Sequence, residues 1–191
     1  LFESFSGLTG TGSSVIADVD NIPASLNYYR HQLCWLGGMG IVVLAVAVLP
    51  MLGVGGMQLY KAESPGVVKD KLTPRITQTA KALWLIYVGI TLACLLAFRL
   101  AGMSWLDAVC HSFSTIATAG FSTHGSSIGH FNSPLIEMIT VFFMFAGAIN
   151  FGLHFMALRR GRFIAYWRDP ELRFFALSLA LLMALVTAML W

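Results

Sequence analysis

The sequence has few charged residues for its length. Only 11% of the 191 residues are Asp, Glu, Lys or Arg, whereas 57% are hydrophobic and the mean hydropathy is +0.75. A soluble domain needs a more polar surface, so the composition predicts a membrane protein. The net charge is only +3, and we expect no nucleic-acid partner.

The residue patterns of enzymes and metal sites are also missing. The apolar stretches contain no nucleophile and base pair and no acidic cluster, which argues against an intramembrane enzyme and against a cofactor. Four histidines have neither an i, i+4 partner nor a carboxylate cluster in the sequence; they are His111, His124, His130 and His154. We therefore expect no metal site in them, and we expect His31 to lie at the membrane interface beside Arg30.

Cysteines are scarce and isolated. Cys34, Cys94 and Cys110 stand singly in apolar stretches without CxxC spacing, which predicts packing residues and not a disulfide framework or a zinc site. There is no initiator methionine: Leu1 lies in a predicted short helix and Trp191 in an apolar run. We therefore expect a fragment, in which a signal peptide cannot be read.

Long apolar runs predict four membrane crossings, at about 32–52, 82–98, 134–158 and 174–191. A threonine and proline at 73–74 would open the second crossing. Most Lys and Arg residues fall in two loops, 53–81 and 159–173, and the positive-inside rule places both on the cytoplasmic side. This topology is consistent only if two shorter segments enter from outside and return.

The two shorter segments are an internal repeat. Ser4-Phe5-Ser6 matches Ser112-Phe113-Ser114, and the same shift of 108 residues places Gly12 on Gly120 and Gly10 on Thr118. The repeat predicts a helix to Leu8 followed by a loop, and a helix over 107–118 followed by a loop. The alternative is a chance match of small residues at helix contacts.

The loops after these helices contain no charged side chain, which favours an ion path lined by backbone carbonyls. Gly12 and Gly120 stand where the backbone needs a φ that a Cβ disfavours. Five hydroxyl side chains would lie near the path, unless they bond back to their own helix: Thr9, Thr11, Ser13, Thr118 and Ser122. This chemistry does not decide between potassium and sodium.

The middle of the third crossing has a weak helix sequence, with Gly147, Asn150 and Gly152 at its centre. One interpretation is a helix broken inside the membrane, whose freed loop lies beneath the filter as a gate. The other is a kinked but closed helix in which Asn150 bonds to a neighbour.

Six stretches of the sequence resemble the Trk/Ktr/HKT superfamily of potassium transporters, most closely its bacterial TrkH-type branch. They are FESFSGLTGTGSSV, RHQLCWLGGMGIVVLAVAVLPMLGVGGMQLYKAESPG, KALWLIYV, HSFSTIATAGFSTH, NFGLHF and YWRDPELR. The resemblance implies an all-α membrane protein, in which four units of helix, re-entrant pore loop and helix surround a potassium-channel-like pore. It divides the chain into 1–55 (pore loop and second helix of repeat two), 56–81 (cytoplasmic loop), 82–158 (repeat three), 159–173 (cytoplasmic loop) and 174–191 (first helix of repeat four).

The resemblance also implies roles for particular residues. The filter would consist of Thr9, Gly10, Thr11, Gly12 and Ser13 with Ala117, Thr118, Ala119, Gly120 and Phe121, and the gate of Gly147, Ala148, Asn150 and Gly152. Gly10 stands where relatives commonly carry threonine, so the first loop is expected to be looser. Members of the family usually form a homodimer and associate with a TrkA-like cytoplasmic nucleotide-binding regulatory subunit.

We therefore expect potassium uptake, as a Trk system component, across the inner membrane of a bacterium. K⁺ at the filter carbonyls would be the only metal, with no cofactor. The alternatives are a sodium-permeable or cation-coupled (symport) member of the superfamily and a membrane scaffold without transport. The basic loops could contact anionic lipid as well as a partner protein.

Overall fold

The computed structural model of the chain describes residues 1–43, 69–160 and 164–190. These residues form helices without any strand, which confirms the all-α fold class. The helices belong to two compact units, Leu1–Ala148 and Ile149–Trp191. Residues 56–68 of the predicted loop 56–81 and residues 44–52 of the predicted crossing 32–52 lie outside the described residues.

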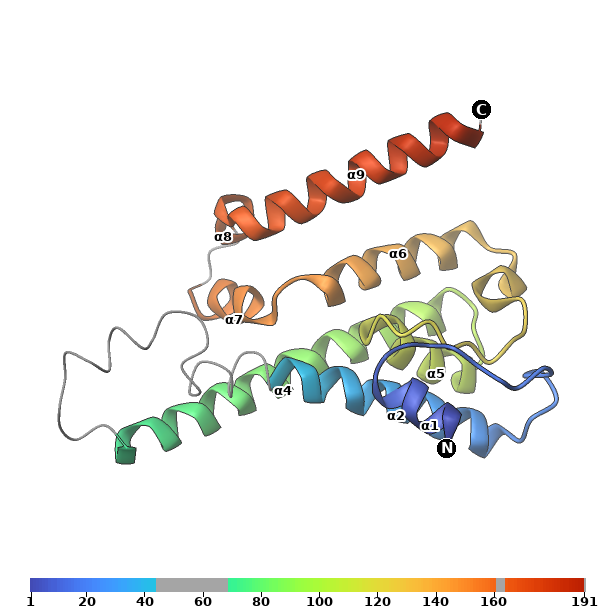
Figure 1. The fold of residues 1–191 in the computed structure, drawn as a ribbon, viewed down its shortest axis with the longest axis horizontal. Helices are drawn as coiled ribbons and strands as arrows, with labels where there is room; N and C mark the ends of the chain where they lie inside the picture. Colours follow the sequence, from blue (N-terminus) through green and yellow to red (C-terminus); the bar gives the residue numbers. More distant parts are fainter. Residues whose placement is uncertain (44–68, 161–163, 191) are drawn as a thin grey trace. The chain divides into compact units, whose positions relative to one another are not determined.

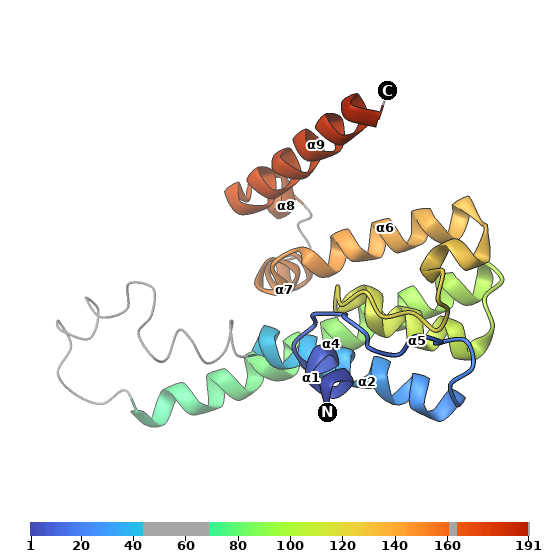
Figure 2. The same ribbon diagram turned by 45° about the vertical axis from the view of Figure 1, so that its right-hand side comes forward.

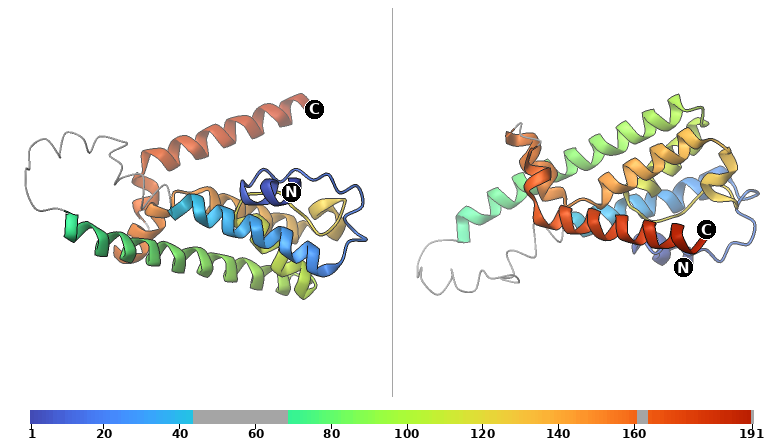
Figure 3. Two further views of the ribbon diagram at one scale, coloured as in Figure 1. Left: turned by 60° about the horizontal axis from the view of Figure 1, so that its bottom comes forward. Right: turned by 90° about the horizontal axis from the view of Figure 1, so that it is seen from above.

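The first unit is built around a short helix. It contains α1 (Phe2–Leu8), α2 (Ala24–Val43), α4 (Lys69–Leu100), α5 (Trp105–Ile116), the 3-10 helix η3 (Ser127–Phe131) and α6 (Pro134–Ala148). The short helix α5 packs against α2, α4 and α6, while α1 packs against α2 (Figure 1, Figure 2). Figure 3 shows α2, α4 and α6 running alongside one another.

The helix α5 begins with a side-chain cap. The Ser104 hydroxyl accepts a hydrogen bond from the Asp107 N–H at 3.1 Å, a cap that typically contributes about 1 kcal/mol. Most of its later residues are buried, including the polar side chains of His111, Ser112 and Ser114. A buried polar helix too short to span a membrane fits the predicted re-entrant element.

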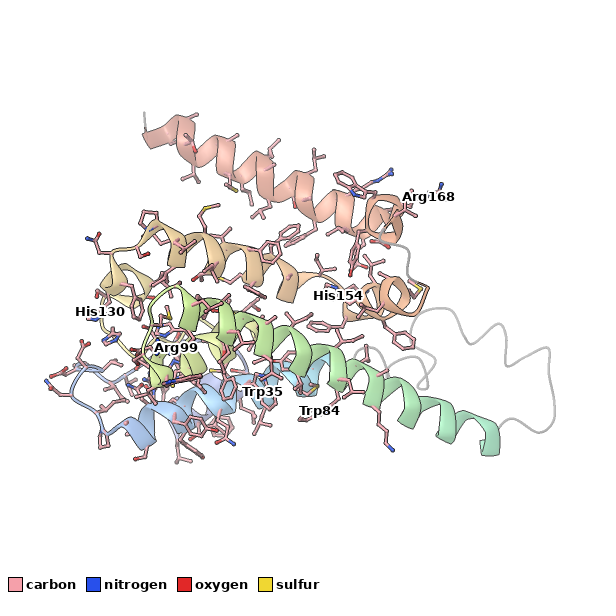
Figure 4. The ribbon with its side chains drawn as sticks, turned by 180° about the vertical axis from the view of Figure 1, so that it is seen from behind. Trp35, Trp84, Arg99, His130, His154 and Arg168 are labelled. Carbon is pink, nitrogen blue, oxygen red and sulfur yellow. The ribbon has the colours of Figure 1, made fainter. Side chains whose placement is uncertain are left out.

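Aromatic side chains hold α2 against α4 and α5. The Trp35 indole N–H donates to the Thr91 hydroxyl at 3.0 Å, and the Tyr87 hydroxyl donates to the Trp35 carbonyl at 3.0 Å. The Trp35 ring meets Trp84 edge to face (Figure 4) and stacks on Phe113, with 5.6 and 5.1 Å between ring centroids. The polar atoms of these side chains are thus paired within the helix bundle, as an apolar surrounding requires.

Two helices of the described residues are long and apolar enough to cross a membrane, Ala80–Leu100 in α4 and Pro170–Met189 in α9. Pro134–Ala148 and Phe151–Leu158 pass the same test as one interrupted span. By length and composition these segments agree with the second, third and fourth predicted crossings, the third with a break in its helix. The three cysteines are free and buried, as predicted.

The second unit contains α7 (Phe151–Arg160), α8 (Ile164–Arg168) and α9 (Pro170–Leu190). His154 Nδ1 lies 2.8 Å from the Tyr166 hydroxyl, which joins α7 to α8. Asn150 Nδ2 donates to Glu171 Oε2 at 3.2 Å, which joins the start of α7 to the first turn of α9. The polar side chains of this unit therefore fix the turns that precede its long helix.

Two helices begin earlier in the chain than the crossings predicted for them. The helix α2 begins at Ala24 and not near Gln32, because the polar residues of its first turns are partly buried and paired. His31, 0% exposed, is among them, and its Nδ1 lies 2.7 Å from the Asn27 carbonyl oxygen. The helix α9 begins at Pro170, four residues before Phe174, because the Asp169 carboxylate caps it by accepting from the Leu172 N–H at 2.9 Å.

Two further boundaries differ from the prediction. The helix α5 covers 105–116 and not 107–118, since Ser104 caps it early and Thr118 leaves the helical region with a φ of 51°. The helix α4 begins at Lys69, so Pro74 lies in its second turn and not at its first position as predicted. The short helices α8 and η3 were not predicted at all.

Candidate ion-binding site

The chain turns in the same way after both short helices. The cap residues Thr9 and Ala117 still have φ values near the helical range, −85° and −74°. Positive φ values follow at alternate residues: 68° at Gly10, 70° at Gly12, 51° at Thr118 and 93° at Gly120. Gly12 and Gly120 thus adopt the conformation predicted for them, and the repeat shift of 108 residues aligns all four positions.

The backbone hydrogen bonds after the two helices also correspond, with each donor and each acceptor displaced by 108 residues. After α1, the N–H groups of Thr9, Gly10 and Thr11 donate to the carbonyls of Phe5, Gly7 and Ser6 at 2.9, 3.0 and 2.9 Å. After α5, those of Ala117, Thr118 and Ala119 donate to Phe113, Thr115 and Ser114 at 3.2, 3.1 and 3.0 Å. The agreement of the φ values and of the backbone hydrogen bonds argues against the chance match as an alternative to a repeat.

The two loops touch. A Cβ placed on Gly12 would lie 1.8 Å from the Ala119 carbonyl oxygen, whereas one on Gly120 would meet no atom within 4 Å. Gly12 is therefore required by both its φ and the approach of the second loop, and Gly120 by its φ alone. Figure 2 shows the loop after α1 and the loop after α5 passing beside each other.

Several of the predicted hydroxyl side chains form hydrogen bonds within the protein. Thr9 Oγ1 donates to the Phe5 carbonyl at 2.8 Å, and Thr118 Oγ1 donates to the Ala117 carbonyl at 2.8 Å. The Ser122 hydroxyl lies 3.0 Å from His111 Nε2 and accepts from the His124 N–H at 3.1 Å. For Thr9 and Thr118, these contacts favour the interpretation in which the hydroxyl bonds to its own segment.

A buried ion pair fixes the first loop. Arg30 Nε donates to Glu3 Oε2 at 2.7 Å, and the two side chains are 2% and 18% exposed. The other Glu3 oxygen accepts from the Ser14 hydroxyl at 2.9 Å and from the Val15 N–H at 2.8 Å. The Arg30 guanidinium lies 4.4 Å from the centroid of the Phe121 ring. One ion pair therefore joins α1, α2, the first loop and the second loop.

Asp107 performs a similar task for the second loop. Its Oδ1 accepts from the Thr123 hydroxyl at 2.6 Å, and its Oδ2 accepts from the Ser104 hydroxyl at 2.7 Å. Partial burial raises the pKa of Asp107, but these hydrogen bonds and the neighbouring His124 outweigh it and lower the pKa below its ordinary value. Asp107 is thus a stable carboxylate at neutral pH.

The third crossing is interrupted where its sequence is weakest. The helix α6 ends at Ala148 and α7 begins at Phe151. The Asn150 side-chain oxygen accepts from the Gly152 N–H at 2.9 Å, so Asn150 caps the new helix. Of the two alternatives, the helix is broken and not merely kinked. A Cβ on Gly147 would lie 2.7 Å from the carbonyl oxygen of Ile116, the residue before the second filter segment.

Sequence reasoning missed Glu3 and Arg30. The two residues are 27 positions apart and belong to no sequence motif. A signal was nevertheless present, because an arginine directly before a long uncharged stretch needs an acidic partner, and Glu3 lies in the predicted short helix. It also missed the carboxylate neighbours of the histidines. His124 lies between Asp20, at 2.9 Å, and Asp107, at 3.4 Å, so the expectation of no carboxylate cluster is wrong.

Comparisons with known proteins agree with this architecture. Residues 1–191 match the TrkH family, described as cation transport proteins. The chain is 58% identical over its full length to the Trk system potassium uptake protein TrkH of Halomonas elongata and 54% identical to that of Escherichia coli. The crystal structure of the potassium transporter TrkH from Vibrio parahaemolyticus superposes with a TM-score of 0.83 at 51% identity.

The chain spans 40% of the length of these two curated relatives. It covers 36% of the Vibrio parahaemolyticus chain, to which 96% of its own length aligns. A match over all of the present sequence, together with the membrane-spanning helices and the repeated loops, leads to one conclusion. The chain belongs to the TrkH family of cation transport proteins.

Proposed function

We propose that the chain is part of a potassium uptake protein of a bacterial inner membrane, and that its two loops provide two segments of the selectivity filter. The observation that carries this proposal is the shared loop conformation. Residues with positive φ alternate with others after each short helix, the backbone pattern by which a carbonyl-lined filter would turn its oxygens toward one side. Relatives named as potassium uptake proteins support potassium as the ion.

Dehydrated K⁺ would be bound by carbonyls of residues 9–13 and 117–121. The C-terminal ends of α1 and α5 precede these segments, and each carries a partial negative charge of about half an electron that favours a cation. No side chain in either segment is ionised, so the ion meets no strong fixed charge that would hold it too tightly. The transport needs no cofactor and no catalytic group.

We further propose that Gly147, Ala148, Asn150 and Gly152 form the gate. The contact of Gly147 with Ile116 supports this role, because it sets the start of the interruption directly against the end of α5. A loop at this place could obstruct or free the path with a small change of backbone conformation.

The partners are also proposals. The relatives are components of a named Trk system, which supports association with a further component. We propose a homodimer that binds a TrkA-like nucleotide-binding subunit through the basic segments 56–81 and 159–173. Anionic lipid head groups would contact the same segments.

The test is uptake by the full-length protein in a bacterium that lacks its own potassium uptake systems. The natural protein should restore growth at low K⁺ and take up Rb⁺. Gly12→Ala should abolish both, because the added methyl would collide with the Ala119 carbonyl at a strained φ. Gly40→Ala is the matched control, since Gly40 lies in α2 with no atom within 4 Å of its Cβ position.

Equal uptake of Na⁺ and Rb⁺ would favour the sodium-permeable alternative. No uptake despite confirmed expression in the membrane, with a functional partner subunit present, would favour the scaffold and overturn the proposal.

A further inference from the structure

Three segments bring ionisable side chains together beside the second loop. Asp20 comes from the chain between the first loop and α2, His124 follows the second loop, and His130 lies in η3. One potential ligand atom from each of these three residues lies within 4.8 Å of the others. Figure 4 shows His130 at the end of the first unit where η3 lies.

Both ring nitrogens of His124 face a carboxylate, as in a histidine that binds a metal ion. One ring nitrogen, Nδ1, lies 2.9 Å from Asp20 Oδ1, while the other, Nε2, lies 3.4 Å from Asp107 Oδ1. In protein metal sites, one nitrogen of a ligating histidine faces the metal and the other donates to a carboxylate that fixes the ring. Asp107 stands where that second carboxylate belongs.

The carboxylate of Asp20 is also held in position. Its Oδ2 accepts from the Gly125 N–H at 3.1 Å, while Oδ1 faces His124. Contacts at both of its oxygens therefore orient the Asp20 carboxylate toward His124.

His130 is the most adjustable member. Its ring stacks on His124 with 3.6 Å between centroids and 6° between planes, and it meets Phe131 edge to face. Nearly parallel rings do not aim their lone pairs at one point, so metal binding requires the His130 ring to tilt. The side chain is exposed, which permits this rotation.

We propose that Asp20, His124 and His130 bind one divalent transition-metal ion of the zinc class. Two imidazoles and one carboxylate suit Zn²⁺, Co²⁺ or Ni²⁺ better than Mg²⁺ or Ca²⁺, which prefer ligand sets made of oxygen alone. Three protein ligands leave a fourth position for water. The bound ion would cross-link the chain that follows the first loop to the chain that follows the second.

The direct test is metal binding by the purified full-length protein, prepared without a histidine tag and stripped with a chelator. Co²⁺ should bind with one equivalent at this site and give the intense visible absorption of a four-coordinate complex, and Zn²⁺ should displace it. Asp20→Asn should weaken binding. Mg²⁺ and Ca²⁺ should not compete.

His130→Phe is the decisive variant, because phenylalanine keeps a ring against His124 but removes the ligand. Losing one ligand should raise the Zn²⁺ concentration for half saturation by at least about tenfold, since even the loss of an outer partner costs 10- to 100-fold. His130→Cys should restore binding, because a thiolate is also a good zinc ligand. Ser126→Ala, at an exposed position in the same segment, should bind as the natural protein does.

Unchanged Zn²⁺ affinity in His130→Phe, or no absorption with Co²⁺, would overturn the proposal and leave a stacked histidine pair. Thermal unfolding without metal should be alike in His130→Phe and the natural protein, which shows that a loss of binding is not a loss of fold. These measurements are independent of ion transport.

An effect on transport rests on the proposed function. If the loops form the filter, Zn²⁺ added on the outer side should slow Rb⁺ uptake severalfold, and His130→Phe should abolish the inhibition. Zn²⁺ binding without inhibition would count against the filter assignment or its coupling to the site, while the metal site itself would stand.

Discussion

Replacing Glu3 by glutamine removes the charge that faces Arg30 while keeping the size of the side chain. The Arg30 side chain is 2% exposed, so water cannot replace the lost carboxylate. Glutamine could still accept from Ser14 and Val15, but its NH₂ group would face the Arg30 Nε–H. Loss of one partner from a buried ion pair costs about 3–5 kcal/mol.

The structure narrows this range. Arg30 keeps two other acceptors, Asn27 Oδ1 at 3.1 Å and the Ser14 hydroxyl at 3.1 Å, and it keeps its contact with Phe121. We therefore expect Glu3→Gln to lower the free energy of unfolding by about 3 kcal/mol, the lower end of the range. Arg30→Met should cost less, because Glu3 is 18% exposed and can be partly hydrated once the cation is gone.

The assay is a double-mutant cycle on the full-length protein. Unfolding by SDS in mixed micelles would give the free energies of the natural protein, Glu3→Gln, Arg30→Met and the double variant. The two substitutions should interact by about 2 kcal/mol, with the double variant more stable than the sum of single costs predicts. Adding salt should change this interaction little, since the Arg30 side chain is only 2% exposed. An interaction energy below about 0.5 kcal/mol, the error of additivity for independent sites, would refute the reasoning.

Three further outcomes are expected. Gly10→Thr should cost no more than about 1–2 kcal/mol in unfolding experiments and keep Rb⁺ uptake, because its repeat equivalent Thr118 already has a φ of 51°. Asn150→Ala should cost about 0.5–2 kcal/mol and speed hydrogen exchange of the Gly152 amide, since it removes the cap of α7. The pKa of Asp107 lies below its ordinary 3.8, so the carboxylate adds its full stability above that pH and loses it as the pH falls further. In Asp107→Asn, the free energy of unfolding should therefore fall less steeply with pH below about 4 than in the natural protein.

The parts of this fold that could be predicted depend on local sequence. The crossings follow from uninterrupted apolar residues, and Gly12 and Gly120 from the need for a φ that other residues disfavour. The break near Asn150 follows from poor helix formers together with an asparagine that can cap a new helix. In each case the residues within one turn or one span are enough to predict the feature.

The parts that could not be predicted depend on contacts across the sequence. Polar residues at the start of α2 indicate a solvated loop when read locally, yet Arg30 is buried because Glu3 neutralises it. His124 has no carboxylate within four positions, but Asp20 reaches it across 104 residues. Only the folded chain brings these groups together.

The repeat also allows the two long helices that contact the ends of α1 and α5 to be compared. A Cβ on Gly37 of α2 would lie 2.0 Å from the Leu8 carbonyl, and one on Gly147 of α6 would lie 2.7 Å from the equivalent Ile116 carbonyl. In both repeats, therefore, a glycine of the following long helix receives the end of the short helix. The helix α2 continues past this contact to Val43, whereas α6 ends one residue beyond it.

The difference lies in the residues after the contact. The chain beyond Gly37 contains no side chain that caps a helix, only Gly38, Met39 and Gly40 followed by branched apolar residues that continue α2. Beyond Gly147 the chain reaches Asn150, whose side chain accepts the Gly152 N–H and starts a new helix. The Asn150 side chain is thus the difference between the interrupted helix and the continuous one after equivalent contacts with a short helix. This difference is why we propose the gate in α6 and α7 and not in α2.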